Sequence, residues 1–330
     1  MSMLKKGTKY SIASLKNMKK MGIRFVFYQT SAKFLPHLLP QKLKFISEKI
    51  SQKNYANISN YLTANYSYII SKYKKLAFNS RPYVKSGQAL DNIWIIWLQG
   101  MKNAPTLVKK CIASVYKNNK TKMIHVLTEK NLSNYIEIPR YILEKYEANI
   151  IGPANFSDIC RSMLLSKYGG IWIDATIFCT RKIPDEITKS YFFSIKRKPQ
   201  RYSMSIANSR WHTFFMLSQP NSLLFCYIRD FLLEYWKKEN KAIDYLLIDY
   251  IIEVGISQIP EIEEIIRNVE YSNKNIFYLE KNFNQKLDSK IINHLFLDNT
   301  FLYKLSNRDK HHTRTWLGEA TVYKFFLDHL

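Results

Sequence analysis

Three charged side chains, Asp158, Arg161 and Asp174, lie within one short stretch of the chain and are the first candidates for chemistry. Carboxylates bind divalent cations, and a guanidinium binds phosphate oxygens, so the set suits a diphosphate and a metal ion. The alternative for Asp158 and Arg161 is structural, because an acid in a first helical turn is stabilising and the two can form an i,i+3 surface pair. For Asp174, which follows an apolar run, we favour function, since α/β folds bind ligands at such strand ends.

A helix is predicted over residues 157–168, directly before a pair of glycines. Asn155 or Ser157 can cap its N-terminus, and Gly169 and Gly170 end it because helix ends often need a positive φ. Four side chains recur within it at the spacing of one buried face: Cys160, Met163, Leu164 and Tyr168.

The apolar run 171–173 predicts a short buried strand that returns alongside this helix. The helix rises about 17 Å and the strand covers about 13 Å, so Asp174 is expected near the helix N-terminus, beside Asp158. Arg161, one turn further along, lies on the same side of the helix as Asp158. Because backbone N–H groups favour an anion at that helix end, we predict a diphosphate site there.

The order of the residues in this segment resembles that of glycosyltransferases with a DXD motif of the sugar-binding-region type, and more closely that of bacterial capsular polysaccharide synthesis proteins. The matching residues are Ser157-Asp158, Arg161, Tyr168-Gly169-Gly170, Trp172 and Asp174, then Trp94, Trp97, Gln99-Gly100, Ala104-Pro105, Cys111, Ser114, Trp236, Asp244-Tyr245 and Lys304-Leu305-Ser306. The resemblance covers roughly residues 91–320. It implies an α/β fold of the GT-A type, with a mostly parallel central sheet, that binds a nucleoside diphosphate sugar such as a UDP-sugar.

The resemblance also implies roles for single residues. Asp174 would carry the metal or the sugar diphosphate, Asp244 would lie on the acceptor side or act as a base, and Lys304 would assist departure of the diphosphate. The residues implied to bind the donor are Trp97, Gln99, Asp158, Arg161, Trp172, Asp174, Thr176, His311, His312 and Trp316. Burial in the core explains Trp97 equally well, and a solvated tail is the alternative for residues 302–316.

One position departs from the DXD pattern, because Thr176 stands where the second acid is usual. Mn²⁺ or Mg²⁺ is commonly held between protein carboxylates and substrate phosphates, and here Asp174 is the metal ligand that the pattern supplies. We therefore expect a divalent cofactor that binds weakly or takes a ligand from elsewhere, with the Thr176 hydroxyl on the metal or the donor sugar. His311 and His312 can add at most one ligand, since neighbours on a strand point oppositely.

Positive charge is concentrated near the N-terminus of the 330-residue chain. Lysine and arginine number 50 against 26 acids, a net charge of +24, of which +16 falls within residues 1–90 and +8 within residues 91–330. We divide the chain into a basic helical region, residues 1–85, and a glycosyltransferase domain, residues 91–330, with the linker at residues 81–90.

The basic region has three interpretations. Lysines beside bulky apolar residues between positions 16 and 39 suit helices that lie on an anionic membrane, and we favour such a surface for residues 1–80. The region can also pack on the catalytic domain with its lysines solvated. Nucleic acid is the least favoured partner, although basic charge with interleaved aromatic residues fits it too.

Cysteine usage and hydropathy predict a cytoplasmic protein, and its basic region would place it at the inner face of the membrane. The four cysteines show no paired spacing and read as reduced core residues: Cys111, Cys160, Cys179 and Cys226. No uncharged apolar run is long enough for a transmembrane helix, and the first 25 residues lack the pattern of a signal peptide.

Strand, helix and strand alternate before the central segment. A strand at residues 92–98, a helix from Pro105 and a strand at residues 123–127 predict a parallel crossover and a nucleotide-binding half-sheet. Further elements are expected as a helix at 139–146, a hairpin of strands at 191–195 and 203–207, and helices at 222–236 and 243–253. On the last helix, Asp244 and Asp249 would point to different faces.

The favoured function is transfer of a sugar to a glycan or lipid-linked acceptor by a hexosyltransferase-like enzyme of capsular or other surface polysaccharide synthesis. The alternative is a non-catalytic basic adaptor that binds membrane or nucleic acid and keeps a degenerate nucleotide-sugar cleft. The missing second acid supports the adaptor. The ordered site residues oppose it, because an adaptor would not need them.

Overall fold

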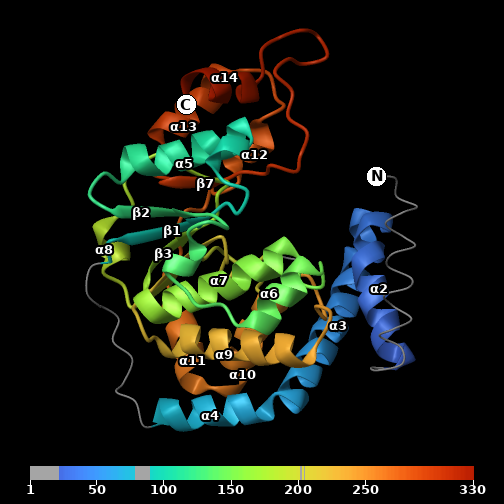
Figure 1. Ribbon diagram of the computed structural model, residues 1–330. Coiled ribbons are helices and arrows are strands. Elements are labelled where there is room, and N and C mark those ends of the chain that lie inside the picture. The colour runs from blue at the N-terminus through green and yellow to red at the C-terminus, as the bar shows by residue number, and fades with distance from the viewer. Residues whose placement is uncertain (1–21, 79–89, 201–202, 204) are drawn as a thin grey trace.

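A five-stranded sheet in the order β2-β1-β3-β6-β5 lies at the centre of the chain (Figure 1). The structure, a computed structural model, describes residues 22–78, 90–200, 203 and 205–330. The strands are β1 (Asn92–Ile96), β2 (Met123–Leu127), β3 (Gly170–Ile173), β5 (Phe192–Ser194) and β6 (Phe215–Ser218). β1 is parallel to β2 and β3, whereas β6 is antiparallel to β3 and β5, so four strands point the same way. The predicted α/β fold with a mostly parallel sheet is confirmed.

The helix α5 (Thr106–Asn118) connects β1 to the parallel strand β2 and begins directly after Pro105, as predicted. The predicted strand at 123–127 coincides with β2. β1 is shorter than the predicted strand at 92–98, because after it the chain turns through Gly100, whose φ is +78°.

The helix α7 (Pro153–Tyr168) begins four residues earlier than predicted. Neither Asn155 nor Ser157 caps it; Pro153 occupies its first turn, where a missing N–H costs nothing. Its C-terminus agrees with the prediction, since Gly169 and Gly170 adopt φ values of +64° and +104° before β3. Helix, turn and strand therefore form the compact unit expected from the sequence.

The predicted hairpin has a different second strand. β5 agrees with the strand expected at residues 191–195, but it pairs with β6 instead of residues 203–207, whose described members form turns and bends. The run that forms β6, Phe215–Ser218, is fully buried between β3 and β5. The predicted helix at 243–253 also begins later, at Leu247.

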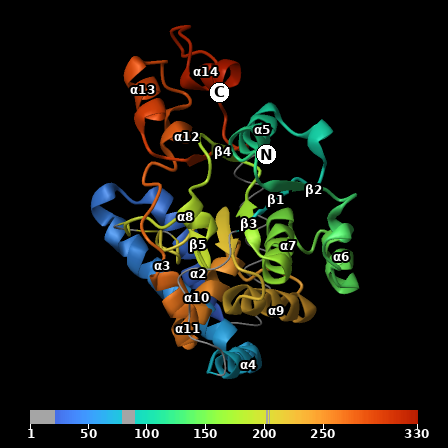
Figure 2. The same ribbon diagram turned by 90° about the vertical axis from the view of Figure 1, so that its left-hand side faces the viewer.

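The sheet is covered on both sides (Figures 1 and 2). Figure 1 shows α5 on one side and α7 and α9 on the other. A two-stranded antiparallel sheet of β4 and β7 packs with the C-terminal helices in a second, smaller apolar cluster. The other elements are β4 (Ile177–Cys179), β7 (Leu302–Lys304), α6 (Arg140–Glu147), α8 (Asp185–Thr188), α9 (Leu223–Lys238), α10 (Leu247–Gln258), α11 (Pro260–Arg267), α12 (Tyr278–Asn282), α13 (Ser289–Leu297) and α14 (Val322–His329).

Three N-terminal helices precede the sheet: α2 (Ile23–Leu38), α3 (Lys44–Asn65) and α4 (Ser67–Phe78). α3 contacts α10, α4 contacts α9 and α10, and α2 packs on α3. The ring of Tyr66 lies 4.9 Å from that of Phe231 in α9, and the Tyr73 hydroxyl donates to Asp230 at 2.8 Å. These helices therefore share the main core. The predicted linker at 81–90 lies outside the described residues except for Leu90, and so do residues 1–21. Among the described residues, no helix combines the length and apolarity required to cross a bilayer.

Candidate active site

A cavity of about 700 Å³ opens at the carboxyl ends of β1 and β3. Residues 96–99 after β1, the N-terminal half of α7 and residues 174–176 after β3 form one part of its lining. The start of α10 and residues 304–309 form another part. Since α/β sheets bind ligands at this edge, and a helix N-terminus favours anions, the cavity is the candidate active site.

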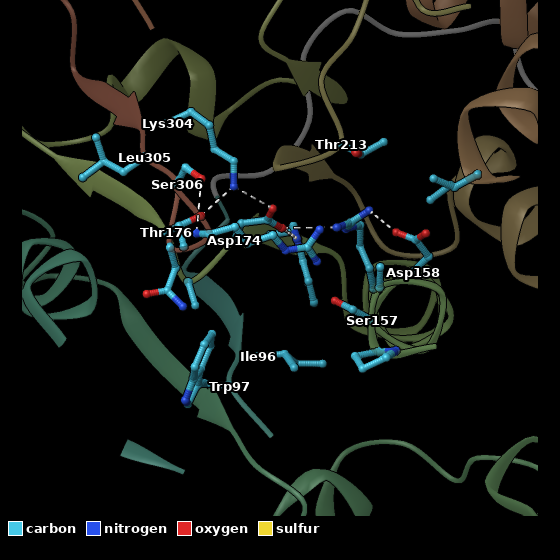
Figure 3. A pocket seen from close by; sticks show the side chains of 18 of the residues that line it. Ile96, Trp97, Ser157, Asp158, Asp174, Thr176, Thr213, Lys304, Leu305 and Ser306 are labelled. Carbon is cyan, nitrogen blue, oxygen red and sulfur yellow. Dashed lines mark hydrogen bonds and ion pairs between the residues drawn. The ribbon is translucent and has the colours of Figure 1, made fainter. Parts of the chain in front are cut away.

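Arg161 joins the two carboxylates that were predicted to lie together, Asp158 and Asp174, which are labelled in Figure 3. Its Nη1 lies 2.8 Å from Asp158 Oδ1 and its Nη2 lies 3.2 Å from Asp174 Oδ1. The guanidinium also stacks 4.7 Å from the ring centre of Trp172, whose Nε1 donates to Asp174 Oδ1 at 2.9 Å. The side chains of Arg161 and Asp158 are only 5% and 11% exposed, so this is not the surface pair of the structural alternative.

Lys304 reaches the same carboxylate from the far end of the sequence (Figure 3). Its Nζ lies 3.2 Å from Asp174 Oδ2 and donates to Thr176 Oγ1 at 2.6 Å. Pairing of β4 with β7 sets Lys304 opposite Ile177, and the N–H of Leu305 donates to the Thr176 carbonyl at 3.0 Å. The backbone therefore positions this lysine, and the strand-end carboxylate is flanked by two cations.

The carboxyl groups of the cavity differ in their affinity for protons. Burial alone would raise the pKa of Asp174, but Lys304 and Arg161 outweigh it, and the pKa lies below its ordinary value. Burial raises the pKa of Asp158 to about 7 despite Arg161. Burial also raises the pKa of Asp249 to about 6, against the hydrogen bond that Trp211 donates at 2.6 Å. Near neutral pH, Asp174 is therefore anionic, whereas Asp158 and Asp249 can gain or release a proton.

A family model for capsular polysaccharide synthesis proteins matches residues 40–325, which include all the elements that line this cavity. The chain belongs to this family. The match begins within the N-terminal helices, so the family's shared region includes α3 and α4 as well as the sheet. Among solved structures, the chain is similar to the PaToxG glycosyltransferase, with 16% identity, 68% of this chain and 83% of that chain covered, and a TM-score of 0.38. No curated protein matches the sequence.

Most of the predicted site residues line one cavity. They are Trp97, Gln99, Asp158, Arg161, Trp172, Asp174, Thr176 and Lys304. Asp244 is not among the described lining residues. It lies just before α10, where its Oδ1 accepts a hydrogen bond from the N–H of Leu246 at 3.0 Å.

The histidines and the tryptophan of the C-terminal tail lie elsewhere. The His311 ring packs against Phe283 and Tyr323, and its Nε2 lies 2.8 Å from the Ser306 carbonyl. His312 and Trp316 line a second hollow, and Trp316 is 92% exposed. None of the three is among the described residues that line the cavity, although His311 contacts the segment that follows Lys304.

Several lining residues were not anticipated from the sequence, among them Asp249, Thr213, Phe277 and Glu280. Asp249 is the most informative, because its carboxylate is buried in a helix that is otherwise strongly apolar. An acid within such a run is a signal for function, since an unpaired buried charge is costly. The predicted helix began at residue 243 and thus included Asp244, and Asp249 was considered only as a second acid on another face of it.

The side chains around Asp174 do not form a divalent cation site. Both of its oxygens accept from N–H donors, and two of those donors, Arg161 and Lys304, are cationic. The Thr176 hydroxyl, the other oxygen of the expected motif, accepts from Lys304. Across the described residues, no group of three or more His, Cys, Asp or Glu side chains is arranged to hold a metal ion. The expected Mn²⁺ or Mg²⁺ therefore has no matching ligand set here.

Proposed function

We propose that the chain is a glycosyltransferase of the GT-A type that moves a sugar from a nucleoside diphosphate sugar to a glycan acceptor in capsular or other surface polysaccharide synthesis. The observation that carries the proposal is the Asp158, Arg161, Asp174 and Lys304 network in a cavity at the carboxyl edge of the sheet. The network pairs cations suited to phosphate with carboxylates suited to sugar hydroxyls. Family membership supports the link to polysaccharide synthesis.

In this proposal each side of the cavity has a separate task. Trp97, at the end of β1, contacts the nucleotide base, and Arg161 and Lys304 face the diphosphate. The bond between the sugar carbon and the diphosphate oxygen breaks, and its electron pair leaves with the diphosphate, whose charge the two cations stabilise. The acceptor hydroxyl forms the new bond, and its proton passes to a cavity carboxylate, for which Asp249 has a suitably raised pKa of about 6.

The Asp174→Asn variant tests this function. We expect the native protein to release nucleoside diphosphate from one donor of a panel, beginning with UDP-sugars, and the variant to do so about 10²–10³-fold more slowly, because the charge that orients both cations is lost. The measurement is diphosphate release with and without Mn²⁺ and with a glycan acceptor. Asp328→Asn, which alters an exposed pair with Lys324, is the matched control and should keep native activity.

Failure to bind or turn over any donor under all of these conditions would contradict the proposed glycosyltransferase activity. Salt-dependent binding of nucleic acid without donor hydrolysis would favour the adaptor in its place.

We further propose that α2 places the enzyme on an anionic membrane, where a lipid-linked acceptor is available. Ile23, Phe27, Phe34 and Leu38 recur at helical spacing and are 70%, 59%, 46% and 74% exposed. Arg24, the neighbour of Ile23, is also exposed, and Lys33 is half-buried in the same helix. An apolar stripe flanked by cations is typical of helices that lie in an anionic lipid interface.

The double variant Phe27→Asp/Leu38→Asp is expected to lose binding to phosphatidylglycerol vesicles by at least about tenfold, since two apolar anchors are removed. Sedimentation with the vesicles measures the binding, and phosphatidylcholine vesicles should bind the native chain weakly. Leu297→Asp is the matched control, because Leu297 is 80% exposed on a different helix, α13. Equal binding by the native chain and the double variant would exclude α2 as the contact.

A further inference from the structure

We infer that Lys304 stands in place of a divalent cation, so that this chain binds the diphosphate of its donor without a metal ion. The inference rests on the proposed function and concerns how that same cavity handles the diphosphate. It begins with the position of the ammonium group: Lys304 Nζ lies between Asp174 Oδ2, at 3.2 Å, and Thr176 Oγ1, at 2.6 Å. These are the two side chains whose oxygens would be the ligands of a metal in a DXD-type motif.

The ligands that a metal would need are already engaged. Asp174 Oδ1 accepts from Arg161 and Trp172, and Asp174 Oδ2 accepts from Lys304. A divalent ion bound to either oxygen would lie close to at least one fixed positive charge and would have to displace it. Hard divalent ions need several oxygen ligands, and a threonine hydroxyl is a weaker partner for them than the carboxylate that it replaces.

The lysine is held by its backbone and not only by its charge. Besides its place opposite Ile177 in β7, its N–H donates to the Ile276 carbonyl at 2.8 Å. Its Nζ lies 5.5 Å from the centre of the Phe214 ring, and its side chain is 24% exposed towards the cavity. Three separate segments therefore fix the ammonium at the strand end, where it remains accessible to a ligand.

The positively charged side chains that line the cavity are consistent with metal-independent binding of a diphosphate. Lys304, Arg161 and Arg308 all line the cavity, and the first two already meet at Asp174. A diphosphate that enters can accept hydrogen bonds from the ammonium and guanidinium groups, which neutralise the charge that a metal ion would otherwise balance. Asp174 then serves as a positioning residue that orients both cations.

Direct metal and nucleotide binding test the inference without relying on turnover. Titration of the native chain with Mn²⁺ alone, followed by electron paramagnetic resonance, should show no ion whose binding depends on Asp174. Calorimetry with a panel of nucleoside diphosphates should give the same affinity in EDTA as in Mn²⁺. Lys304→Met should weaken nucleotide binding at least tenfold, Lys304→Arg should retain most of it, and the exposed control Lys182→Met should match the native chain.

A variant that restores the usual motif provides a second test. In Lys304→Ala/Thr176→Asp the lysine is absent and the second acid is present, so this variant should gain one Mn²⁺ and bind nucleotide only with the metal. Thermal unfolding of each variant confirms that it is folded. Asp174-dependent Mn²⁺ binding by the native chain, or nucleotide binding that EDTA abolishes, would overturn the inference and leave the transferase intact. Absence of nucleotide binding under every condition would overturn the proposed function, and the role of Lys304 with it.

Discussion

Replacing Arg161 by alanine is expected to lower the free energy of unfolding by about 3–5 kcal/mol, because it leaves buried carboxylates without their shared partner. Asp158 loses its contact at 2.8 Å and Asp174 loses one of its two cations. Urea unfolding measures the change. Arg140→Ala is the matched control, since Arg140 forms an i,i+4 pair with Glu144 while 92% exposed, and its loss should cost under about 1 kcal/mol.

The size of the Arg161→Ala effect should depend on pH. The pKa of Asp158 is raised to about 7 and would rise further without the guanidinium, so its folded form favours the protonated acid. A group with a raised folded pKa contributes stability at low pH and loses it as pH rises through that pKa. The variant should therefore be closer to the native protein at pH 5 than at pH 8. A pH-independent change, or one below about 1 kcal/mol, would contradict the buried ion network.

The companion variant Asp158→Asn/Arg161→Met distinguishes the cost of an unpaired buried carboxylate from the effect of losing the cation itself. It removes one carboxylate together with the guanidinium, and Asp174 keeps its contacts with Lys304 and Trp172. Replacing a buried pair by uncharged groups is often neutral, so the double variant should be more stable than Arg161→Ala alone. Donor binding should remain impaired in both, since both lack the cation.

Gly170→Ala is expected to lower the free energy of unfolding by about 2–6 kcal/mol, the combined cost of backbone strain and overpacking. Gly170 has a φ of +104°, which a side chain rarely adopts. A Cβ there would lie 2.7 Å from the Asn92 carbonyl oxygen and 2.8 Å from Trp94 Nε1. To relieve these close contacts, β3 would have to move away from β1, and it would move Asp174, which directly follows β3.

Gly152→Ala is the matched control for this prediction. Gly152 has a φ of −75°, and a Cβ built on it meets no atom within 4 Å. Its substitution should change the free energy of unfolding by less than about 1 kcal/mol. Both variants can be compared by thermal and urea unfolding. Equal stability of the two would show that β1 and β3 do not approach as closely as the structure has them.

Local patterns in the sequence were sufficient to predict the helix, turn and strand that carry Asp158, Arg161 and Asp174. A helix that ends at two glycines and returns as a short apolar strand is encoded by neighbouring residues, and the rise per residue of each element sets where Asp174 lies. The predicted meeting of two carboxylates and a guanidinium follows from that arithmetic, and the contacts of Arg161 agree with it. The alternation of strand and helix from residue 92 to residue 127 likewise predicted the parallel pairing of β1 with β2.

Long-range packing determined the rest of the site. Lys304 lies 130 residues from Asp174, and only the pairing of β4 with β7 brings its ammonium to that carboxylate. The insertion of β6 between β3 and β5, and the entry of Asp249 into the cavity, depend in the same way on which distant segments pack together. Propensity and periodicity describe each segment's own backbone and apolar face. They do not specify which of several apolar segments fills a place in the sheet, because that choice is made by the free energy of the whole core.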